Sequence, residues 1–362
     1  MEVRLEQLTK TFSGNVLAVH SIDLEIASGE FTVFLGPSGC GKTTTLRMIA
    51  GLEKQDSGNV FIGDRLVNYL PPKDRNVAMV FQRIALYPSL NVFDNIAFPL
   101  MVRKVSKAEI KQKVNDAAKL VGVQRLLERR PSQVSGGEAQ RVAIAQTLVR
   151  EPDVLLMDEP LSSLDAKLRI QLRAELKHIH QNIPRTTIYV THDQEEAMTL
   201  GDKIVVMDQG IVLQVGTPRQ IFFQPCNRFV AQFVGTPSMN LFEGEVRAEA
   251  GSLIFQTTAF NQPLTNTLAA AVQARNVSRI FWGVRPDTVK VTRTAAPNDI
   301  QGVVDVVELL GTRQLVFIKV NSATFTVMIE SAFLLAPGDT VYLHFEAHDI
   351  YLFEADSGDS LL

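Results

Sequence analysis

The segment GPSGCGKT at residues 36–43 constrains the fold of this chain more than any other feature. It follows a short apolar run at residues 31–35 and precedes TTLRMIAGL, which has the composition of a helix. A Gly-x-x-x-x-Gly-Lys-Ser/Thr motif between a strand and a helix is typical of phosphate loops. Its glycines let backbone N–H groups close around phosphates, and the helix start adds a partial positive charge. The pattern predicts an α/β sheet with a nucleotide at its edge.

The whole loop is predicted to bind the nucleotide. Lys42 is expected to reach the β- and γ-phosphates, and the Thr43 hydroxyl to ligate Mg²⁺. A glycine-rich turn that binds nothing is the alternative, which the full motif in its strand–loop–helix context disfavours. The predicted nucleotide-binding residues of the loop are Gly36, Pro37, Ser38, Gly39, Cys40, Gly41, Lys42, Thr43 and Thr44.

A pair of carboxylates follows another apolar run, in the segment VLLMDEP at residues 154–160. A buried strand that ends in Asp158 places this side chain at the carboxyl edge of the sheet, where open α/β folds bind ligands. Asp158 is expected to hold Mg²⁺ through water, and Glu159 to orient an attacking water as general base. Two acidic residues at the start of a surface loop are the alternative, which the phosphate loop upstream disfavours.

Apolar runs alternate with helical patterns up to about residue 222. Continuous apolar runs are typical of strands that are buried on both faces, as in a parallel sheet. Apolar residues at helical spacing among charges predict two short helices at residues 105–128, within a helical subdomain at about 84–150. The predicted strands of the sheet include residues 31–35, 154–157, 187–190 and 204–207.

The sequence changes character after residues 225–240, where Pro and Gly mark an exit from the first domain. The remainder has short β-rich runs between turn residues, typical of a small antiparallel barrel or sandwich. With 362 residues the chain is long enough for two domains. We predict an α/β P-loop NTPase domain at 1–235 and a smaller all-β domain, like an OB barrel, at 236–362. Trp282 is predicted to be a core residue of the second domain.

Composition limits the partners of the chain. A net charge of −3 gives no electrostatic reason to bind nucleic acid or an anionic membrane surface. Two cysteines, Cys40 and Cys226, cannot form a disulfide framework and suit a reducing cytoplasm. The N-terminal residues lack the pattern of a signal peptide, and no apolar run reaches the roughly 20 residues that span a bilayer. A role at a membrane is therefore expected to depend on docking to another chain.

Six motifs in a specific order resemble those of the ATP-binding cassette ATPases, and they cover the whole first domain. Their flanks, the segment GVRPD at 283–287 and the C-terminal stretch GDTVYLHFEAHDIYLFEADSG are similar to the ATPase subunits of sugar importers of the maltose-importer type. The six motifs are GPSGCGKT at 36–43, FQ at 81–82, SGGE at 135–138, MDEP at 157–160, SSLD at 162–165 and THD at 191–193.

The resemblance implies that the SGGE turn binds a nucleotide held by a second chain. In this family two cassettes pack head to tail, and each signature turn closes over the ATP in the phosphate loop of its partner. A turn with two glycines at the start of a helix is an anion site. We therefore expect ATP hydrolysis only in a dimer. The residues expected to bind the partner's nucleotide are Ser135, Gly136, Gly137 and Glu138.

Four further residues take their roles from the resemblance. Phe12 matches the aromatic that stacks on adenine, although a single aromatic could equally be core. Gln82 matches the glutamine that touches Mg²⁺ and the attacking water, and Asp165 matches the aspartate at the dimer seam. His192 matches the switch histidine, which contacts the γ-phosphate. The implied catalytic residues are Glu159, His192 and Gln82, and the implied Mg²⁺ ligands are Thr43, Gln82 and Asp158.

The chain departs from the common family pattern at two places. Val134 and Glu138 replace the leucine and glutamine of the usual LSGGQ signature, and Glu138 is expected to weaken closure if it faces the phosphates. Ser135 and both glycines remain, so we expect activity to be retained. The loop after Gln82 reads RIALYP, where the family more often has a serine and a tyrosine before ALYP. That face is expected to meet the transmembrane subunits, through a groove that grips a short cytoplasmic helix.

The resemblance implies an ATPase that energises import of a carbohydrate or related solute, such as an oligosaccharide, a glycoside or a polyol. Its implied partners are a second cassette, two permease subunits, an extracytoplasmic solute-binding protein, and a regulatory protein on the C-terminal domain. That domain is expected to contact its twin in the dimer. The implied location is the cytoplasmic face of the inner membrane, where the permeases hold the chain peripherally.

Three other functions remain open. An exporter ATPase would more often be fused to membrane spans, and a cassette protein acting on DNA or ribosomes would more often have duplicated cassettes or long coiled coils. A regulatory binding protein without catalysis is disfavoured by Glu159 and His192 as a sole role. The transported solute is not encoded in this chain, because the ATPase does not touch the cargo.

Overall fold

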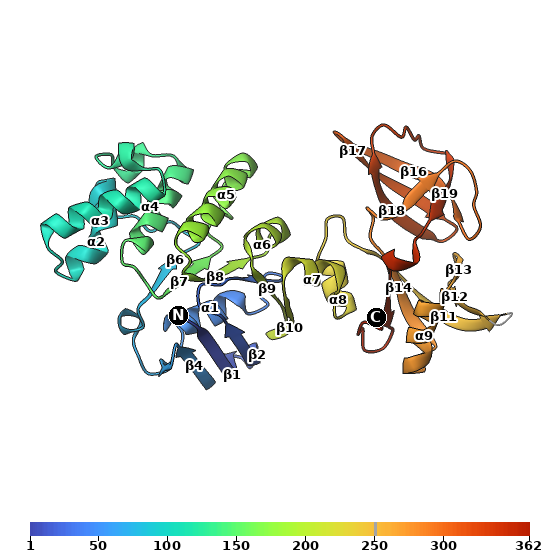
Figure 1. Ribbon diagram of the computed structural model, residues 1–362, viewed down its shortest axis with the longest axis horizontal. Helices are drawn as coiled ribbons and strands as arrows, with labels where there is room; N and C mark the ends of the chain where they lie inside the picture. Colours follow the sequence, from blue (N-terminus) through green and yellow to red (C-terminus); the bar gives the residue numbers. More distant parts are fainter. Residues whose placement is uncertain (250–251) are drawn as a thin grey trace. The chain divides into compact units, whose positions relative to one another are not determined.

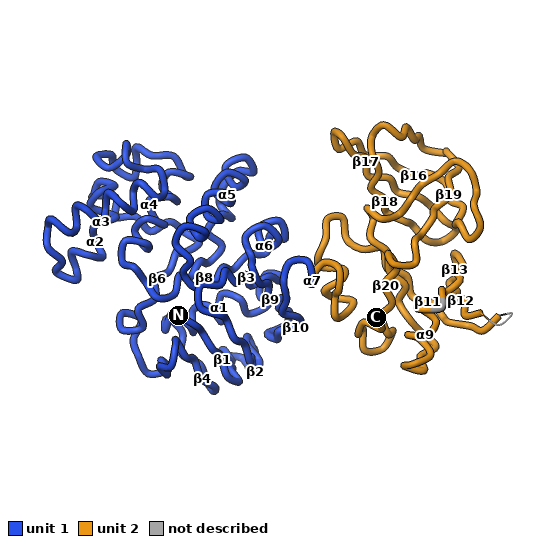
Figure 2. The backbone as a smooth tube through the Cα atoms, in the orientation of Figure 1, with its two compact units in different colours: residues 1–220 blue, residues 221–362 orange. Residues whose placement is uncertain are grey.

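The computed structural model describes residues 1–249 and 252–362. Within them the chain forms two compact units, Met1–Gln220 and Ile221–Leu362 (Figure 2). Among the described residues, no helix is both long and apolar enough to cross a bilayer.

Residues 221–235 lie in the second unit, which therefore begins before the expected boundary at residue 235. They include the end of α7 (Pro218–Phe223) and all of α8 (Arg228–Phe233). Arg285, only 2% exposed, donates hydrogen bonds to the carbonyl oxygens of Phe222 and Val234. Because a buried guanidinium needs such acceptors, these bonds fix the segment to the second unit.

A six-stranded sheet forms the centre of the first unit (Figure 1). Its strand order is β10-β9-β3-β8-β7-β6, and neighbouring strands run parallel except β10 and β9. Every residue of β3, β7 and β8 is buried, which accounts for their continuous apolar runs and confirms the predicted strands. The strands are β3 (Phe31–Leu35), β6 (Val77–Val80), β7 (Val154–Asp158), β8 (Thr186–Thr191), β9 (Lys203–Asp208) and β10 (Ile211–Gly216).

A second, antiparallel sheet of order β2-β1-β4-β5 was not predicted. One apolar core joins this sheet, helix α1 (Lys42–Ala50) and the central sheet, with Leu5, Leu46 and Val190 among its members. The helix that starts at the phosphate loop is thereby held firmly on both sides. The strands are β1 (Val3–Phe12), β2 (Val16–Ile26), β4 (Ser57–Ile62) and β5 (Arg65–Leu66).

Three helices pack on one another at one end of the first unit (Figure 1), as the predicted helical subdomain requires. The expected second helix of residues 105–128 is wrong, because α3 is followed only by a 3₁₀ turn at Gln124–Leu126. Gly122, with φ of +70°, reverses the backbone after α3. The helices of the unit are α2 (Val92–Val102), α3 (Lys107–Leu120), α4 (Gly136–Leu148), α5 (Ala166–Asn182) and α6 (Gln194–Leu200), with 3₁₀ turns at Pro72–Asp74 and Pro131–Gln133.

The second unit contains two five-stranded antiparallel sheets of order β13-β12-β11-β14-β20 and β15-β19-β16-β17-β18. Trp282 is fully buried among phenylalanines, including Phe255 and Phe345, which confirms it as core. Helix α9 (Asn266–Arg275) was not predicted within this β-rich region. The strands are β11 (Asn240–Glu249), β12 (Ser252–Gln256), β13 (Asn261–Pro263), β14 (Arg279–Val284), β15 (Lys290–Thr292), β16 (Ile300–Leu310), β17 (Arg313–Val320), β18 (Ala323–Glu330), β19 (Thr340–His344) and β20 (Ile350–Glu354), with a 3₁₀ turn at Ala347–Asp349.

Candidate nucleotide-binding and hydrolytic site

The phosphate loop runs from the end of β3 to the start of α1, and its surroundings require two of its glycines. Gly41 precedes the first turn of α1 with φ of +104°. A Cβ at Gly41 would lie 2.4 Å from the carbonyl oxygen of Ala18, and one at Gly36 would lie 2.2 Å from that of Met207. The loop is therefore a tight backbone cradle at a helix N-terminus, where an anion is stabilised.

Lys42 lies buried within this cradle, only 4% exposed. Its Nζ donates to the carbonyl oxygens of Gly36 at 2.8 Å and Pro37 at 2.7 Å, and lies 3.6 Å from Sγ of Cys40. Burial raises the pKa of the Cys40 thiol, and Lys42 opposes this shift. The thiol therefore stays protonated at neutral pH, and the ammonium group supplies the positive charge that phosphates require.

Thr43 and Asp158 bring a hydroxyl and a carboxylate together beside the cradle. Oγ1 of Thr43 donates to Oδ1 of Asp158 at 2.7 Å, and Asp158 is 5% exposed. Burial raises the pKa of Asp158, while the hydrogen bond from Thr43 and the charge of Arg47 lower it. Hard oxygen donors beside bound phosphates are the ligands that Mg²⁺ prefers. This donor pair therefore fits Mg²⁺, with Thr43 and Asp158 as the residues that would hold it.

The side chains of Gln82 and His192 both reach the carboxylate of Glu159. Nε2 of Gln82 donates to Oε2 of Glu159 at 3.2 Å, and Nδ1 of His192 lies 3.1 Å from Oε1. The Glu159 side chain is 17% exposed and that of His192 is 52% exposed, so the group is open to water. A carboxylate that is oriented by two side chains and accessible to solvent can position a water molecule and accept its proton.

The sheet topology accounts for this meeting of three distant segments. Gln82, Glu159 and His192 follow the carboxyl ends of β6, β7 and β8, which are parallel neighbours. Glu159 itself has a left-handed backbone, with φ of +44°, and its N–H donates to the carbonyl oxygen of Val190 at 3.0 Å. A non-glycine residue in this region is uncommon and is found preferentially at functional sites.

The SGGE turn has a different set of contacts. Ser135 caps α4, where its Oγ accepts from the N–H of Glu138 and Oε2 of Glu138 accepts from the N–H of Ser135 at 2.9 Å. This capping box turns Glu138 back onto its own helix. The Ser135 N–H lowers the pKa of Glu138, so the carboxylate stays ionised at neutral pH. The described contacts of Glu138 are with this turn and with Arg125, 3.7 Å away, and not with the Glu159 group.

Asp165 and Phe12 also lie outside the Glu159 group. Asp165 caps α5, and its Oδ1 accepts from the N–H of Leu168 at 3.0 Å. Phe12 ends β1, and its ring is 41% exposed, with Nζ of Lys10 5.3 Å from the ring centroid. An exposed ring with a cation nearby is available for stacking against a planar ligand.

A network behind His192 was missed from the sequence. The side chains of Tyr189 and Thr191 donate to the same oxygen of buried Glu196, at 2.8 and 2.7 Å. Asp193 donates its N–H to Oγ1 of Thr191 and accepts from the first turn of α6. The network therefore fixes the turn that carries His192. An aspartate before the acidic run QEE has the pattern of a helix cap, which could have indicated the role of Asp193.

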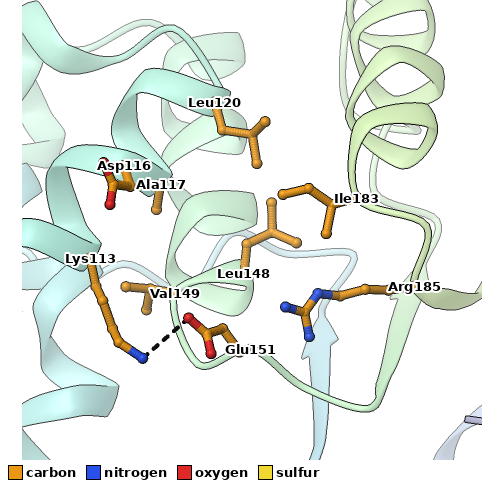
Figure 3. Close-up of a pocket in the computed structure, with 9 residues that line it drawn as sticks. All are labelled: Lys113, Asp116, Ala117, Leu120, Leu148, Val149, Glu151, Ile183 and Arg185. Carbon is orange, nitrogen blue, oxygen red and sulfur yellow. Dashed lines mark hydrogen bonds and ion pairs between the residues drawn. The ribbon is translucent and has the colours of Figure 1, made fainter.

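The cavity of about 220 Å³ shown in Figure 3 is separate from these residues. It lies between α3, the end of α4 and the segment before β8, with apolar Leu120, Leu148 and Ile183 and charged side chains around them. Lys113 and Glu151 pair across its rim at 3.2 Å. None of its described lining residues belongs to the predicted nucleotide site.

Comparison with known proteins agrees with the motif order. The sequence model described as ABC transporter matches residues 19–162, and that described as TOBE domain matches residues 282–353. The chain is 45% identical over 371 residues to the trehalose/maltose import ATP-binding protein MalK of Thermococcus litoralis, covering 99% of both chains. The chain belongs to the ABC transporter family. It is also 42% identical over 359 residues to the sn-glycerol-3-phosphate import ATP-binding protein UgpC of Yersinia pseudotuberculosis, covering 98% of both chains.

Solved ABC transporter structures are similar to part of the chain. One is the dimeric, post-hydrolysis state of an ATP-binding cassette bound to ADP and phosphate, 32% identical with a TM-score of 0.54. It matches 60% of this chain and 99% of its own. Another is cbiO1 of Clostridium perfringens, 29% identical with a TM-score of 0.57, matching 60% of this chain and 89% of its own. The P-loop cassette fold predicted from the sequence is confirmed.

Proposed function

We propose that this chain is the ATP-hydrolysing subunit of an ABC importer that takes up a carbohydrate or a related solute. The observation that carries the proposal is the meeting of Gln82 and His192 at Glu159, beside a complete phosphate cradle. The names of the full-length relatives, which are import ATP-binding proteins for trehalose and maltose or for glycerol phosphate, support the importer class.

The phosphate loop and α1 would bind the phosphates of ATP through backbone N–H groups and Lys42. Mg²⁺, held by Thr43, by Asp158 and by Gln82, would neutralise phosphate charge. Glu159 would orient a water molecule and accept its proton, while His192 and Gln82 keep its carboxylate in place. The exposed ring of Phe12 would stack on adenine.

The second half of each site would come from another copy of the chain. The N–H groups of Gly136 and Gly137, in the first turn of α4, have no carbonyl acceptor within the helix, as at every helix start. Together with Ser135 they would close over the γ-phosphate in the partner, with Asp165 at the seam. The dimeric cassette among the similar structures supports this arrangement.

Exposed apolar side chains on the loop after β6 and on α2 would receive the permease subunits. Phe81, Tyr87, Met101 and Val102 are 43%, 43%, 43% and 66% exposed. Asn95 of α2 fixes the loop that carries Tyr87 by a hydrogen bond in each direction. A firm loop beside exposed apolar side chains suits an amphipathic helix from a permease. The chain would then be held at the cytoplasmic face of the inner membrane by its permeases, which receive solute from a binding protein outside.

The second unit would contact its twin in the dimer and receive regulatory proteins. Its match to the TOBE domain supports a module separate from catalysis. The solute class rests on the relatives, whose names include both disaccharides and glycerol phosphate.

Capture from native membranes tests the proposal. The tagged chain should retain two multispanning permeases after gentle solubilisation, identified by mass spectrometry. Deleting the chain should abolish uptake of their solute. The wild-type chain should restore uptake, whereas Lys42→Ala and Glu159→Gln should not. Glu159→Gln should nevertheless bind ATP and form a stable ATP-dependent dimer. Recovery of only soluble partners would refute the importer function. Glu159→Gln hydrolysing ATP at the wild-type rate would instead remove Glu159 from the role of general base.

A further inference from the structure

Arg169, on the first turn of α5, joins two turns that carry different parts of the proposed site. Its Nη1 donates to Oδ2 of Asp193 at 3.2 Å, and its Nη2 donates to the carbonyl oxygen of Leu164 at 3.1 Å. Asp193 directly follows His192, and Leu164 directly precedes Asp165. One guanidinium therefore connects the turn of the switch histidine to the turn at the dimer seam.

The turn that contains Leu164 also supports the signature glycines. A Cβ at Gly136 would lie 3.8 Å from Cδ2 of Leu164, and one at Gly137 would lie 2.5 Å from Cδ2 of Leu168. The start of α4 therefore packs directly on the start of α5. A shift of the Leu164 turn would be felt at the signature turn, because closely packed groups do not yield independently.

We propose that Arg169 is a positioning residue for ATP hydrolysis. It holds the His192 turn in register with the Asp165 turn and, through the latter, with the signature glycines. The two hydrogen bonds leave from different nitrogens of one planar group, so the guanidinium sets the distance between the turns. The inference rests on the proposed ATP hydrolysis, in which His192 acts on one side of the nucleotide and the partner's signature turn on the other.

If Arg169 only stabilised the fold, its replacement would change Tm but not kcat. The side chains of Arg169 and Asp193 are 32% and 24% exposed, and a partly exposed ion pair typically contributes no more than about 1 kcal/mol to folding. A neighbouring pair offers a matched control, because Nη1 of Arg173 also reaches from α5 to α6, contacting Oε2 of Glu195 at 3.1 Å. Among the described contacts, the Arg173 side chain reaches neither of the two turns, and Arg173→Met leaves the N–H bond from Glu195 to Asp193 in place.

The experiment compares Arg169→Met with Arg173→Met. ATP turnover is measured over a range of protein concentrations, and nucleotide binding and thermal unfolding are measured on the same samples. Arg169→Met is expected to lower kcat about ten- to a hundredfold, since a small misplacement of catalytic groups has an effect of this size. KM for ATP should stay within about threefold, because the phosphate loop is untouched. Its Tm should match that of Arg173→Met, whose kcat should remain near wild type.

A second substitution isolates the contact. Asp193→Asn keeps the oxygen that caps α6 but removes the charge that faces Arg169. In this background Arg169→Met should lower kcat much less than in wild type, as expected for two residues that act as a pair. Arg169→Lys keeps the charge and most of the aliphatic stem, so it should recover only part of the rate. It also takes the place of Arg169→Met if the Met variant does not fold.

The outcomes separate the two proposals. If wild type does not hydrolyse ATP, the proposed function fails. If wild type hydrolyses ATP and Arg169→Met and Arg169→Lys match Arg173→Met in kcat, the positioning role is overturned. Additive effects of Arg169→Met and Asp193→Asn would overturn it as well.

Discussion

Replacing Glu138 with Gln should tighten the ATP-dependent dimer. In the free chain Oε2 of Glu138 accepts from the N–H of Ser135 at 2.9 Å and from its hydroxyl at 3.0 Å. The hydroxyl has one proton, so Glu138 and the γ-phosphate of the partner's nucleotide would compete for it. Glutamine also completes a capping box, so the helix start is kept while the negative charge is removed.

The magnitude follows from the geometry of the turn. A phosphate oxygen that binds the Ser135 hydroxyl lies about 2.7 Å beyond it. Together with the 3.0 Å to Glu138, this puts the two anions about 5–6 Å apart when the Ser135 hydroxyl lies between them. Repulsion at that separation is about 0.8 kcal/mol in water and about 3 kcal/mol near a protein surface. The dimer has two such sites, so about 1.6–6 kcal/mol of repulsion is removed and the dimer Kd should fall by about 14-fold to about 2 × 10⁴-fold. The lost charge at the start of α4 should cost the monomer about 0.3–1 kcal/mol.

Sedimentation equilibrium with ATP measures this effect, in a Glu159→Gln background that keeps the nucleotide intact. Glu151→Gln is the charge-matched control, because Glu151 pairs with Lys113 at the cavity rim. The difference between the two variants should shrink at high salt, as for any partly exposed charge. If Glu138→Gln dimerises no more tightly than Glu151→Gln, the proposed approach of this carboxylate to the partner's phosphate is wrong.

Two further predictions concern packing and burial. Gly137→Ala should lower the free energy of unfolding by about 1–3 kcal/mol, because its Cβ would overlap the Leu168 side chain, whereas Gly136→Ala should leave it near wild type. Denaturant unfolding measures this difference. Leu168→Ala in the Gly137→Ala background should recover part of the lost stability. Equal stability of Gly136→Ala and Gly137→Ala would contradict the packing. Burial raises the pKa of Glu196, so its contribution to stability is present in acid and is lost as pH rises through the raised pKa. Glu196→Gln should thus gain stability relative to wild type from about pH 5 upward, and a difference that stays constant with pH in urea titrations would contradict this.

The grouping of several candidate residues at one sheet edge could be predicted, because their motifs follow buried strands. Apolar runs before Gly36, Glu159 and His192 locate strand ends, and parallel strands bring such ends to one edge. The topology that makes β6, β7 and β8 neighbours is a long-range property, which the runs alone do not specify. The resemblance implied that Gln82 touches the attacking water, but its direct hydrogen bond to Glu159 was not predicted.

Other features could not be predicted, because they depend on contacts across the fold. The pairing of Arg169 with Asp193 joins two helix starts that are separate in sequence. The left-handed backbone of Glu159 is imposed by its neighbours and not by its residue type. Glu138 is a different case: Ser-x-x-Glu before a helical run is a readable capping box, so its fold-back onto Ser135 had a local signal.

The two signature glycines illustrate why a dimer is needed to explain the sequence. Gly137 is required by its own chain, since a Cβ there would overlap three atoms of Leu168. Gly136 is not: a Cβ there would make only an ordinary contact of 3.8 Å with Leu164, and its φ is not in the left-handed region. The absence of a side chain at Gly136 therefore has no explanation within the described contacts of one chain. The proposed approach of an anion to the backbone at this helix start would account for it. This agrees with the proposal that the turn closes over the nucleotide of a partner, and one of the similar solved cassettes is a dimer.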